Sequence, residues 1–349
     1  MSRAREGTRS GGSRRTVIRA PNHLGDLVMS LPALAAAPAA DILIARWLEP
    51  LLALALPGRT AIPLDRGARG FLRGVRALRA RRYDRGIILP PSFSSALLFR
   101  AGRVRERRGI DAHSRAPLLT DILDRRMYAG VHRAARFLTL VTGDRSPAGS
   151  PPVPGVAIPA ALRERWLALA GDTARATIGL FPGSNAASRR WDAERFADVA
   201  HALVARGERV IVFGGPHERN LTAAVAGSVA VDMGGRTDLP LLAAALSECA
   251  LLVTNDSGPL HLAAAVGTPT VSLWGAGDPA VTGPLGEGHL LLRHPELPCV
   301  PCVRNTCPRH GRGYILDSAS RECVRLFTAA EVTARALAHR SATPLARRY

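Results

Sequence analysis

The segment from Ala250 to Gly275 constrains the fold of this chain more than any other. Ala250–Thr254 is a short apolar run, which is typical of a buried parallel strand. Asn255–Gly258 has turn chemistry, Leu260–Val266 has the pattern of a small apolar helix, and Thr270–Trp274 that of a second strand. The segment therefore predicts a βαβ unit within a parallel α/β sheet.

The loop that opens the helix of this unit is a candidate anion site. The first N–H groups of a helix are free and lie at its positive dipole end, so they bind phosphate readily. Asp256, Ser257 and Gly258 form this helix start, and His261 lies one turn further on, where it can face the same anion. The alternative is a structural crossover in which Asp256 or Ser257 only caps the helix.

Strand and helix patterns alternate along the rest of the chain. This alternation predicts parallel sheets covered by helices on both faces. Helices are expected at Phe71–Arg82, Asp192–Arg206 and Leu239–Glu248. Further strands are expected at Thr16–Ala20, Asp41–Ala45, Ala61–Leu64, Gly86–Leu89, Arg107–Ile110, Ala176–Phe181 and Arg209–Phe213. Gly143–Pro159 is a Pro/Gly/Ser-rich linker, which predicts two α/β domains with a ligand cleft at the carboxyl ends of their strands.

The basic residues are concentrated in the first half of the chain. The net charge is +19, and all 47 basic residues are Arg. Residues 1–150 hold 27 Arg and 11 acidic residues, a net charge of +16, whereas residues 151–349 have a net charge of +3. The asymmetry predicts an anionic partner for the first half: a phosphorylated glycan, an anionic lipid surface or nucleic acid. The alternative is a basic surface that is only solvated.

The sequence contains no segment typical of membrane insertion. No uninterrupted apolar run approaches the roughly 18 residues of a spanning helix, and the best candidate, Ile42–Leu56, is broken by Arg46 and Glu49. Residues 1–15 are basic and lack the apolar core of a signal peptide, so we expect a disordered tail on a soluble cytoplasmic protein. The G-x-G-x-x-G and G-x-x-x-x-G-K-[ST] motifs of nicotinamide dehydrogenases and P-loop NTPases are absent.

Polar residues follow the first predicted strand at Asn22–Asp26. A carboxylate at this position, in a loop at the mouth of the cleft, can accept a proton from a substrate hydroxyl, so Asp26 is a candidate catalytic base. The alternative is that Asp26 caps the following helix. Asn22 and His23 lie in the same loop and are candidate acceptor-binding residues.

Two loops in the second half are candidate donor-binding sites. The segment 181–191 holds a glycine turn with Gly183 and Ser184, followed by Arg189 and Arg190. Either arginine can neutralise a diphosphate, because guanidinium binds phosphate oxygens bidentately. The alternative is a surface loop of an Arg-rich protein. Glu218, after another strand, is placed like the acidic residue that holds a ribose hydroxyl pair in nucleotide-binding folds. Trp191 is expected in the core.

Four of the five cysteines form a C-x2-C-x4-C-x15-C pattern near the end of the chain. They are Cys299, Cys302, Cys307 and Cys323. In a cytosolic protein such spacing indicates a metal site before a disulfide, and four thiolates suit structural zinc. Reduced thiols are the next alternative, and iron–sulfur ligation is a further one. Cys249 stands alone and is expected to be buried.

Four blocks of the sequence together resemble glycosyltransferase family 9, the lipopolysaccharide heptosyltransferases. The blocks are V-I-R-A-P-N-H-L-G-D-L-V-M-S-L-P-A-L at Val17–Leu34, P-G-S-N-A-A-S-R-R-W at Pro182–Trp191, V-F-G-G-P-H-E at Val212–Glu218 and N-D-S-G-P-L-H-L-A-A-A-V-G-T-P at Asn255–Pro269. Their order and spacing span nearly the whole chain. The cysteine segment C-V-P-C-V-R-N-T-C is most similar to the heptosyltransferase II branch.

The resemblance implies a GT-B fold, in which two Rossmann-like domains face a central cleft. Residues 16–158 would bind the acceptor, and residues 159–349 would bind the nucleotide sugar, with the last helix packing back on the first domain. The implied reaction moves heptose from ADP-heptose to an inner-core lipopolysaccharide or a related anionic glycan. It inverts the anomeric centre and requires no cofactor, so any zinc would be structural.

The resemblance also assigns roles to individual residues. Asp26 would be the general base, and Glu218 would hold the adenosine ribose. Arg189 stands where the family commonly has Lys; it keeps the charge at the leaving group but changes the geometry. The residues that the resemblance places along the donor diphosphate are Asp256, Ser257, Gly258 and His261.

The implied partners are the nucleotide sugar, a lipid-linked anionic glycan and, peripherally, the inner face of the cytoplasmic membrane. No nucleic acid is expected, since aromatic residues make up only 5% of the chain and form no stacking platform. Two alternatives stay open. One is a family member that uses another nucleotide sugar for a different glycan. The other is a glycan- or nucleic-acid-binding protein that has kept the fold without catalysis.

Overall fold

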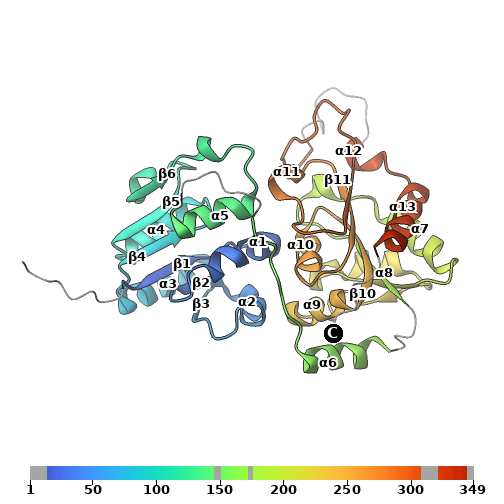
Figure 1. The fold of residues 1–349 in the computed structure, drawn as a ribbon, viewed down its shortest axis with the longest axis horizontal. Coiled ribbons are helices and arrows are strands. Elements are labelled where there is room, and N and C mark those ends of the chain that lie inside the picture. The colour runs from blue at the N-terminus through green and yellow to red at the C-terminus, as the bar shows by residue number, and fades with distance from the viewer. Residues whose placement is uncertain (1–13, 145–150, 172–175, 308–320, 344–349) are drawn as a thin grey trace, which may run out of the picture.

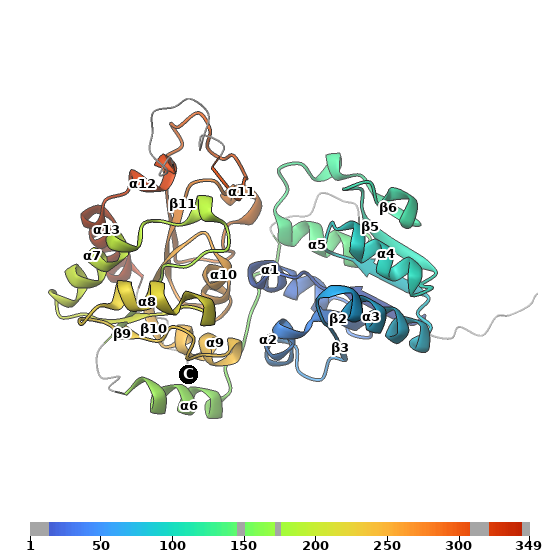
Figure 2. The same ribbon diagram turned by 180° about the vertical axis from the view of Figure 1, so that it is seen from behind.

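The computed structural model describes residues 14–144, 151–171, 176–307 and 321–343. In these residues the chain forms two α/β domains, each built on a six-stranded parallel sheet (Figures 1 and 2). The predicted disordered tail, residues 1–15, falls outside the described residues except for its last two positions. Among the described helices, none combines the length and the apolar character needed to cross a membrane.

The N-terminal sheet has the strand order β3-β2-β1-β4-β5-β6, the order of a Rossmann fold. Its strands are β1 (Thr16–Arg19), β2 (Asp41–Ala45), β3 (Ala61–Leu64), β4 (Arg85–Ile88), β5 (Glu106–Ile110) and β6 (Asp121–Leu123). The helices of this domain are α1 (Leu24–Ala35), α2 (Glu49–Ala55), α3 (Gly67–Arg81), α4 (Phe93–Ala101) and α5 (Arg133–Thr142).

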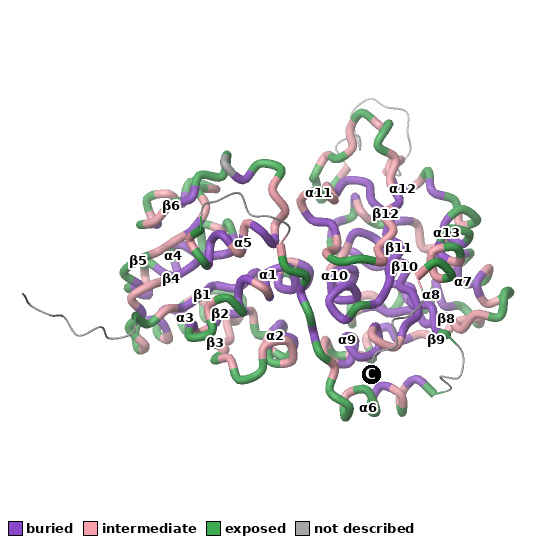
Figure 3. Tube along the Cα trace, viewed as in Figure 1, coloured by how far each residue is buried: buried purple, intermediate pink, exposed green. Residues whose placement is uncertain are grey.

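The C-terminal sheet repeats this topology, with the order β12-β11-β10-β7-β8-β9. Its strands are β7 (Thr177–Phe181), β8 (Arg209–Val212), β9 (Val231–Asp232), β10 (Cys249–Asn255), β11 (Thr270–Trp274) and β12 (His289–Arg293). Its helices are α6 (Ala160–Ala170), α7 (Ala193–Val204), α8 (Arg219–Ala226), α9 (Leu239–Ser247), α10 (Gly258–Ala265), α11 (Pro279–Thr282), α12 (Glu322–Arg325) and α13 (Ala329–Ala342). The central strands are buried along their whole length, as their continuous apolar runs predict (Figure 3).

The two domains meet through helices rather than through strands. Helices α1, α2 and α5 lie on the face of the first sheet that is turned toward the second domain, where they contact α10, α9 and α11 respectively. One apolar cluster runs continuously from α1 and α2 into α9 and α10. The linker joins the same contact, since the N–H of Val156 donates to the carbonyl of Ala265 at 2.9 Å. The linker thus holds the end of α10, and the starts of α1 and α10 lie together, since a Cβ at Gly258 would approach Leu24 Cβ to 2.8 Å.

Two expectations need correction. The last described helix, α13, packs on α7, β10 and β11 of its own domain, so it does not return to the first domain. The pattern also missed the outer strands β6, β9 and β12. β6 and β9 are only three and two residues long and contain Asp, so they have too few apolar positions to give a strand period.

Candidate active site

The site begins where β10 ends. Asp256 follows this strand directly and is only 2% exposed. Its Oδ2 lies 3.1 Å from Nη1 of Arg189, which comes from the 3-10 turn Ala187–Arg189. Ser257 is the N-cap residue of α10, but its side chain makes no capping hydrogen bond. Asp256 therefore pairs with a guanidinium, and in the described residues it is not merely a cap of α10.

The Asp256–Arg189 pair has unused hydrogen-bonding capacity. Burial raises the pKa of Asp256 to about 6, and the positive charge of Arg189 opposes that rise. Oδ2 of Asp256 faces Nη1 of Arg189 in this ion pair, but among the described residues no donor meets it in hydrogen-bond geometry, and Nε of Arg189 has no hydrogen-bond partner. An unpaired buried polar atom is costly in free energy, which a ligand at this position would relieve. The Arg189 side chain is 25% exposed, so a ligand can reach it.

Asn255 anchors both ends of the loop that carries Arg189. This residue is fully buried, its Nδ2 donates to the carbonyl of Pro182 at 2.7 Å, and its Oδ1 accepts from the N–H of Trp191 at 3.1 Å. Trp191 is buried as expected, and its indole N–H donates to the carbonyl of Phe327 at 3.3 Å. One amide at the end of β10 thus sets the path of the whole segment 182–191.

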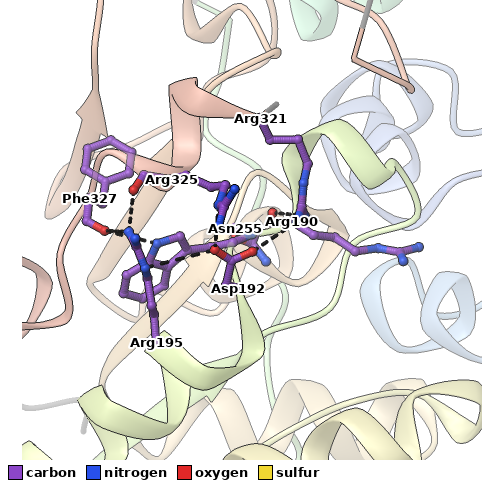
Figure 4. Close-up of polar contacts among 8 residues, drawn as sticks. Arg190, Asp192, Arg195, Asn255, Arg321, Arg325 and Phe327 are labelled. Carbon is purple, nitrogen blue, oxygen red and sulfur yellow. Dashed lines mark hydrogen bonds and ion pairs between the residues drawn. The ribbon is translucent and has the colours of Figure 1, made fainter. Parts of the chain in front are cut away.

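An ionic network braces the same loop from the outside (Figure 4). Asp192 pairs with Arg321 at 3.0 Å and with Arg325 at 3.1 Å. Arg321 also donates to the carbonyl of Arg190 at 2.6 Å, and Arg195 donates to the carbonyls of Arg325 and Phe327. The segment around α12 therefore holds the C-terminal end of the Arg189 loop.

We expect Asn255→Ala to lower the free energy of unfolding by roughly 2–4 kcal/mol, because each buried polar group left unpaired costs about 1–3 kcal/mol. The loss leaves the Pro182 carbonyl and the Trp191 N–H without partners. Denaturant unfolding measures it, with the exposed Asn220→Ala as the matched control. An equal effect of the two substitutions would contradict the anchoring role.

Gly183, Ser184 and Glu218 lie together at the neighbouring strand ends. A Cβ at Gly183 would lie 1.9 Å from Oε1 of Glu218, so a side chain at this position would force the carboxylate to move. Oε2 of Glu218 accepts from the N–H of Gly215 at 2.7 Å. The hydroxyl of Ser184 donates to the carbonyl of Asp256 at 3.3 Å. The three predicted donor residues are therefore continuous with the Asp256–Arg189 pair, and their roles toward a nucleotide stay predictions.

The N-terminal domain contributes Asp26 to the site. Helix α1 begins at Leu24, so Asp26 lies in the first helical turn and not in the loop where it was expected. A carboxylate is favoured there by the positive end of the helix dipole. Nη1 of Arg133, at the start of α5, donates to Oδ1 of Asp26 at 2.5 Å. No described residue donates to the other oxygen, Oδ2.

The loop before α1 is shaped by a buried arginine. Arg19, at the end of β1, donates to Asn22 Oδ1 and to the carbonyls of Ala20 and Leu43. Burial lowers its pKa to about 10. Asn22 and His23 are exposed, and His23 is the N-cap residue of α1 without a capping bond of its own. Arg19 thus occupies the amide oxygen of Asn22, and no described residue accepts from its amide nitrogen; the acceptor-binding roles of Asn22 and His23 stay predictions.

His261 lies in the contact between α1 and α10, which differs from the expectation that it points toward the donor diphosphate. It is 6% exposed, and a Cβ at Gly25 would lie 2.6 Å from its Cδ2. Burial lowers the pKa of His261 to about 4, so the imidazole is neutral at pH 7 and supplies no positive charge to a phosphate. Gly258 lies in the same contact, since a Cβ there would approach Leu24 Cβ to 2.8 Å.

We expect Gly25→Ala to destabilise the protein by about 1–3 kcal/mol, the usual cost of overpacking. Combining it with His261→Ala removes the ring that the new methyl group meets, so the double variant should be more stable than the sum of the two single changes predicts. Thermal unfolding of the four proteins measures this coupling. Additive effects would show that Gly25 and His261 do not pack against each other.

The charges from the two domains converge. Besides Arg189, the groups that act on the pKa of Asp256 are Arg133, which lowers it, and Asp26, which raises it. Asp26 and Arg133 also act on the pKa of His261. The site therefore has one acid–guanidinium pair from each domain, placed where the starts of α1 and α10 meet. Arg133, Asn255 and Arg19 were not singled out by sequence reasoning, because an arginine in this Arg-rich chain or an asparagine in a turn-like segment carries no distinctive local signal.

The four clustered cysteines come close to one another without forming a metal-binding group. Burial first, and then the neighbouring Cys299, Cys302 and Cys307, raise the pKa of the Cys323 thiol to about 11. Within the described residues, no three His, Cys, Asp or Glu side chains are arranged so that they could hold a metal ion. The thiols as placed do not fit a zinc site, and the metal stays a prediction. Cys249 is buried at the start of β10, as expected.

Two Rossmann-like domains with their polar strand ends facing each other define the GT-B class of glycosyltransferases. The sequence profile of "Glycosyltransferase family 9 (heptosyltransferase)" matches residues 71–311, and the chain belongs to this family. It is therefore a glycosyltransferase, which confirms the resemblance found in the four sequence blocks.

Individual relatives agree with this assignment. The chain is 29% identical to lipooligosaccharide heptosyltransferase 2 of Haemophilus influenzae over 72% of its own length and 79% of the relative's. It is 28% identical to lipopolysaccharide heptosyltransferase 2 of Escherichia coli K12, over 78% and 86%. Among solved structures, E. coli ADP-heptose LPS heptosyltransferase II superposes with a TM-score of 0.77 at 24% identity, covering 94% of this chain and 99% of that one. E. coli heptosyltransferase WaaC with ADP gives 0.63 at 20% identity, covering 80% and 93%.

Proposed function

We propose that the protein transfers heptose from ADP-heptose to an inner-core lipopolysaccharide acceptor, with inversion at the anomeric carbon. The observation that carries the proposal is the convergence of two acid–guanidinium pairs, Asp26–Arg133 and Asp256–Arg189, from opposite domains. One pair suits the acceptor and the other suits the donor. Heptosyltransferase 2 relatives, similar over most of the chain, support this choice of sugar and acceptor.

On the acceptor side, Asp26 removes the proton from the attacking hydroxyl. Arg133 holds Oδ1 and orients the carboxylate, so the free Oδ2 is the oxygen that takes the proton. The amide nitrogen of Asn22 is positioned to hold the acceptor, because Arg19 fixes the amide oxygen. A single carboxylate on this side is enough for direct displacement, in contrast to the paired acids of a glycosidase.

On the donor side, Arg189 neutralises the charge that develops on the diphosphate as the bond to the sugar breaks. The free N–H groups at the start of α10 add preorganised donors. Oδ2 of Asp256, which is ion-paired with Arg189 but has no donor in hydrogen-bond geometry among the described residues, can accept from a sugar hydroxyl. Glu218 holds the ribose. His261, neutral and buried, contributes to the donor site by packing α10 against α1.

The test is a donor panel with a defined inner-core acceptor. ADP-heptose should give a product of inverted anomeric configuration, detected by NMR, and ADP-glucose, UDP-glucose and UDP-N-acetylglucosamine should give little or none. Preference for another nucleotide sugar would overturn the ADP-heptose assignment and favour a family member that builds a different glycan. The lipid-linked acceptor implies that the enzyme works at the inner face of the cytoplasmic membrane as a peripheral protein.

We further propose that the cysteine cluster takes up structural zinc, with no catalytic role for the metal. The thiols are not arranged as a metal-binding group in the described residues, so uptake of zinc would require the cluster to rearrange. The support for the proposal is the chemistry of the donor set, since four thiolates are a usual zinc ligand set. We expect about one zinc per chain in elemental analysis of untagged protein. Loss of zinc in the Cys299→Ser variant would assign the metal to the cluster. If protein purified under reducing conditions contains neither zinc nor iron, the cysteines are ordinary thiols and the zinc proposal fails.

A further inference from the structure

Helices α3 and α4 cover the face of the N-terminal sheet that is turned away from the C-terminal domain. Figures 1 and 2 show both helices at the far end of the N-terminal domain, whereas α1 lies beside the second domain. A Cβ at Gly74 of α3 would meet Leu98 of α4, and one at Gly102 would meet Leu78. The two helices therefore run side by side in the same direction, and their outer surface is separate from the proposed active site.

Large apolar side chains are exposed on this outer surface. Leu72 of α3 is 54% exposed, and Phe93 and Leu97 of α4 are 46% and 37% exposed. Gly74 of α3 lies at the same height along the helix axes as Leu98 of α4. Leu72 of α3 and Leu97 of α4 therefore lie at similar heights on the two parallel helices, and Phe93 lies one turn before Leu97 on α4. Three such side chains on one face gain free energy when a partner removes them from water.

Arginines surround these apolar side chains, and neither helix contains an acidic residue. Arg73 pairs with Asp65 and Arg81 with Asp41. Arg69 and Arg76 are exposed and make no ion pair within the part of the chain that the structure describes. The arginines of the two helices are Arg69, Arg73, Arg76, Arg79, Arg81 and Arg100.

We propose that this α3–α4 surface, formed by Arg69, Leu72, Arg76, Phe93, Leu97 and Arg100, docks on an anionic lipid bilayer. A bilayer matches both features, because its headgroups attract the guanidinium groups and its interface takes up the apolar side chains. A free anionic glycan or a nucleic acid would match the charge and leave Leu72 and Leu97 in water. The proposal rests on the proposed function only in that a lipid-linked acceptor brings the enzyme to such a surface.

The experiment measures co-sedimentation of the full-length protein with vesicles that contain no glycan acceptor. Vesicles of phosphatidylethanolamine and phosphatidylglycerol should bind the protein, with affinity falling as salt rises, and vesicles of phosphatidylcholine should bind it poorly. The variant R69E/R76E should bind the anionic vesicles at least ~10-fold more weakly, since each arginine near the surface contributes several-fold. L72Q/F93Q should also weaken binding, at unchanged net charge.

Matched controls come from the C-terminal domain. R206E/R335E makes the same change in net charge at exposed positions, and L326Q removes an apolar side chain that is 47% exposed. Both controls should bind vesicles much as the parent does. Equal weakening of vesicle binding by R69E/R76E and R206E/R335E would overturn the proposal, and so would a parent protein that does not bind anionic vesicles. The proposal would also fail if R69E/R76E weakened binding to RNA and left binding to anionic vesicles unchanged. Transfer to a soluble truncated acceptor should be unchanged in R69E/R76E, so failed docking is distinguishable from a wrong assignment of the reaction.

Discussion

The Asp26→Asn variant is expected to turn over at least ~100-fold more slowly than the parent, the low end of what removal of a general base costs. The amide keeps the shape of the side chain and can no longer take the proton of the acceptor hydroxyl. ADP affinity should stay close to that of the parent, because Asp26 belongs to the domain opposite the donor loops. Initial rates with saturating donor and acceptor, together with calorimetric titration of ADP, measure both quantities.

The matched control is Asp121→Asn. Asp121 is also an ion-paired carboxylate of the N-terminal domain, with its Oδ2 2.6 Å from Nε of Arg108, but it lies on the edge strand β6 and not on α1. This variant should keep its turnover. Near-parental turnover in Asp26→Asn with a verified acceptor would remove Asp26 from the mechanism. A similar loss in both variants would assign the effect to the structure of the domain.

Arg189→Ala should weaken ADP binding by roughly 1.5–3 kcal/mol, the range for a hydrogen bond to a charged group. The substitution also leaves Asp256 buried without its guanidinium partner. Since Arg189 opposes the rise of the Asp256 pKa, that pKa should move further upward in the variant. A larger fraction of Asp256 would then be protonated at neutral pH. The added loss of stability would be smallest at low pH, because a carboxyl whose folded pKa is raised is penalised as pH rises from its unfolded pKa through its folded pKa.

Adenosine separates a phosphate contact from a general loss of the site. It lacks the diphosphate, so Arg189→Ala should bind adenosine much as the parent does. The control Arg206→Ala, at an exposed position after α7, should bind both ligands normally. Unchanged ADP affinity in Arg189→Ala would place the diphosphate elsewhere. Equal losses for ADP and adenosine would show that the loop, and not a phosphate contact, had been disturbed.

Gly258→Val illustrates how the structure changes the reason for a prediction. The sequence suggests that a side chain here blocks the diphosphate at a loop edge while the protein still folds. In the structure the new side chain would meet Leu24 of α1. Any loss of ADP binding in this variant would therefore come with a disturbed contact between the two domains, and it could not by itself locate the phosphate.

Local pattern was enough to predict most of the secondary structure. The strands at Asp41–Ala45 and Thr270–Trp274 were predicted with their observed ends, because apolar runs between turn signals are characteristic of buried parallel strands. The strand at Ala61–Leu64 was also predicted with its observed ends, although it is a partly buried edge strand that contains Pro63. The edge strand β9, with only two residues, offers no such run. The start of α1 was placed too late, since His23 makes no side-chain capping bond that would mark it.

The sequence by itself determined that there are two parallel α/β domains, which loops carry the polar residues, and to which family the chain belongs. These properties depend on residue type and spacing along the chain. The tertiary structure alone decided the partners: that Arg133 pairs with Asp26, that Asn255 anchors the Arg189 loop, and that His261 packs on Gly25 and is neutral. Each of these contacts joins residues from different secondary-structure elements, and pairing, burial and the resulting pKa depend on distances in space, which spacing along the chain does not specify.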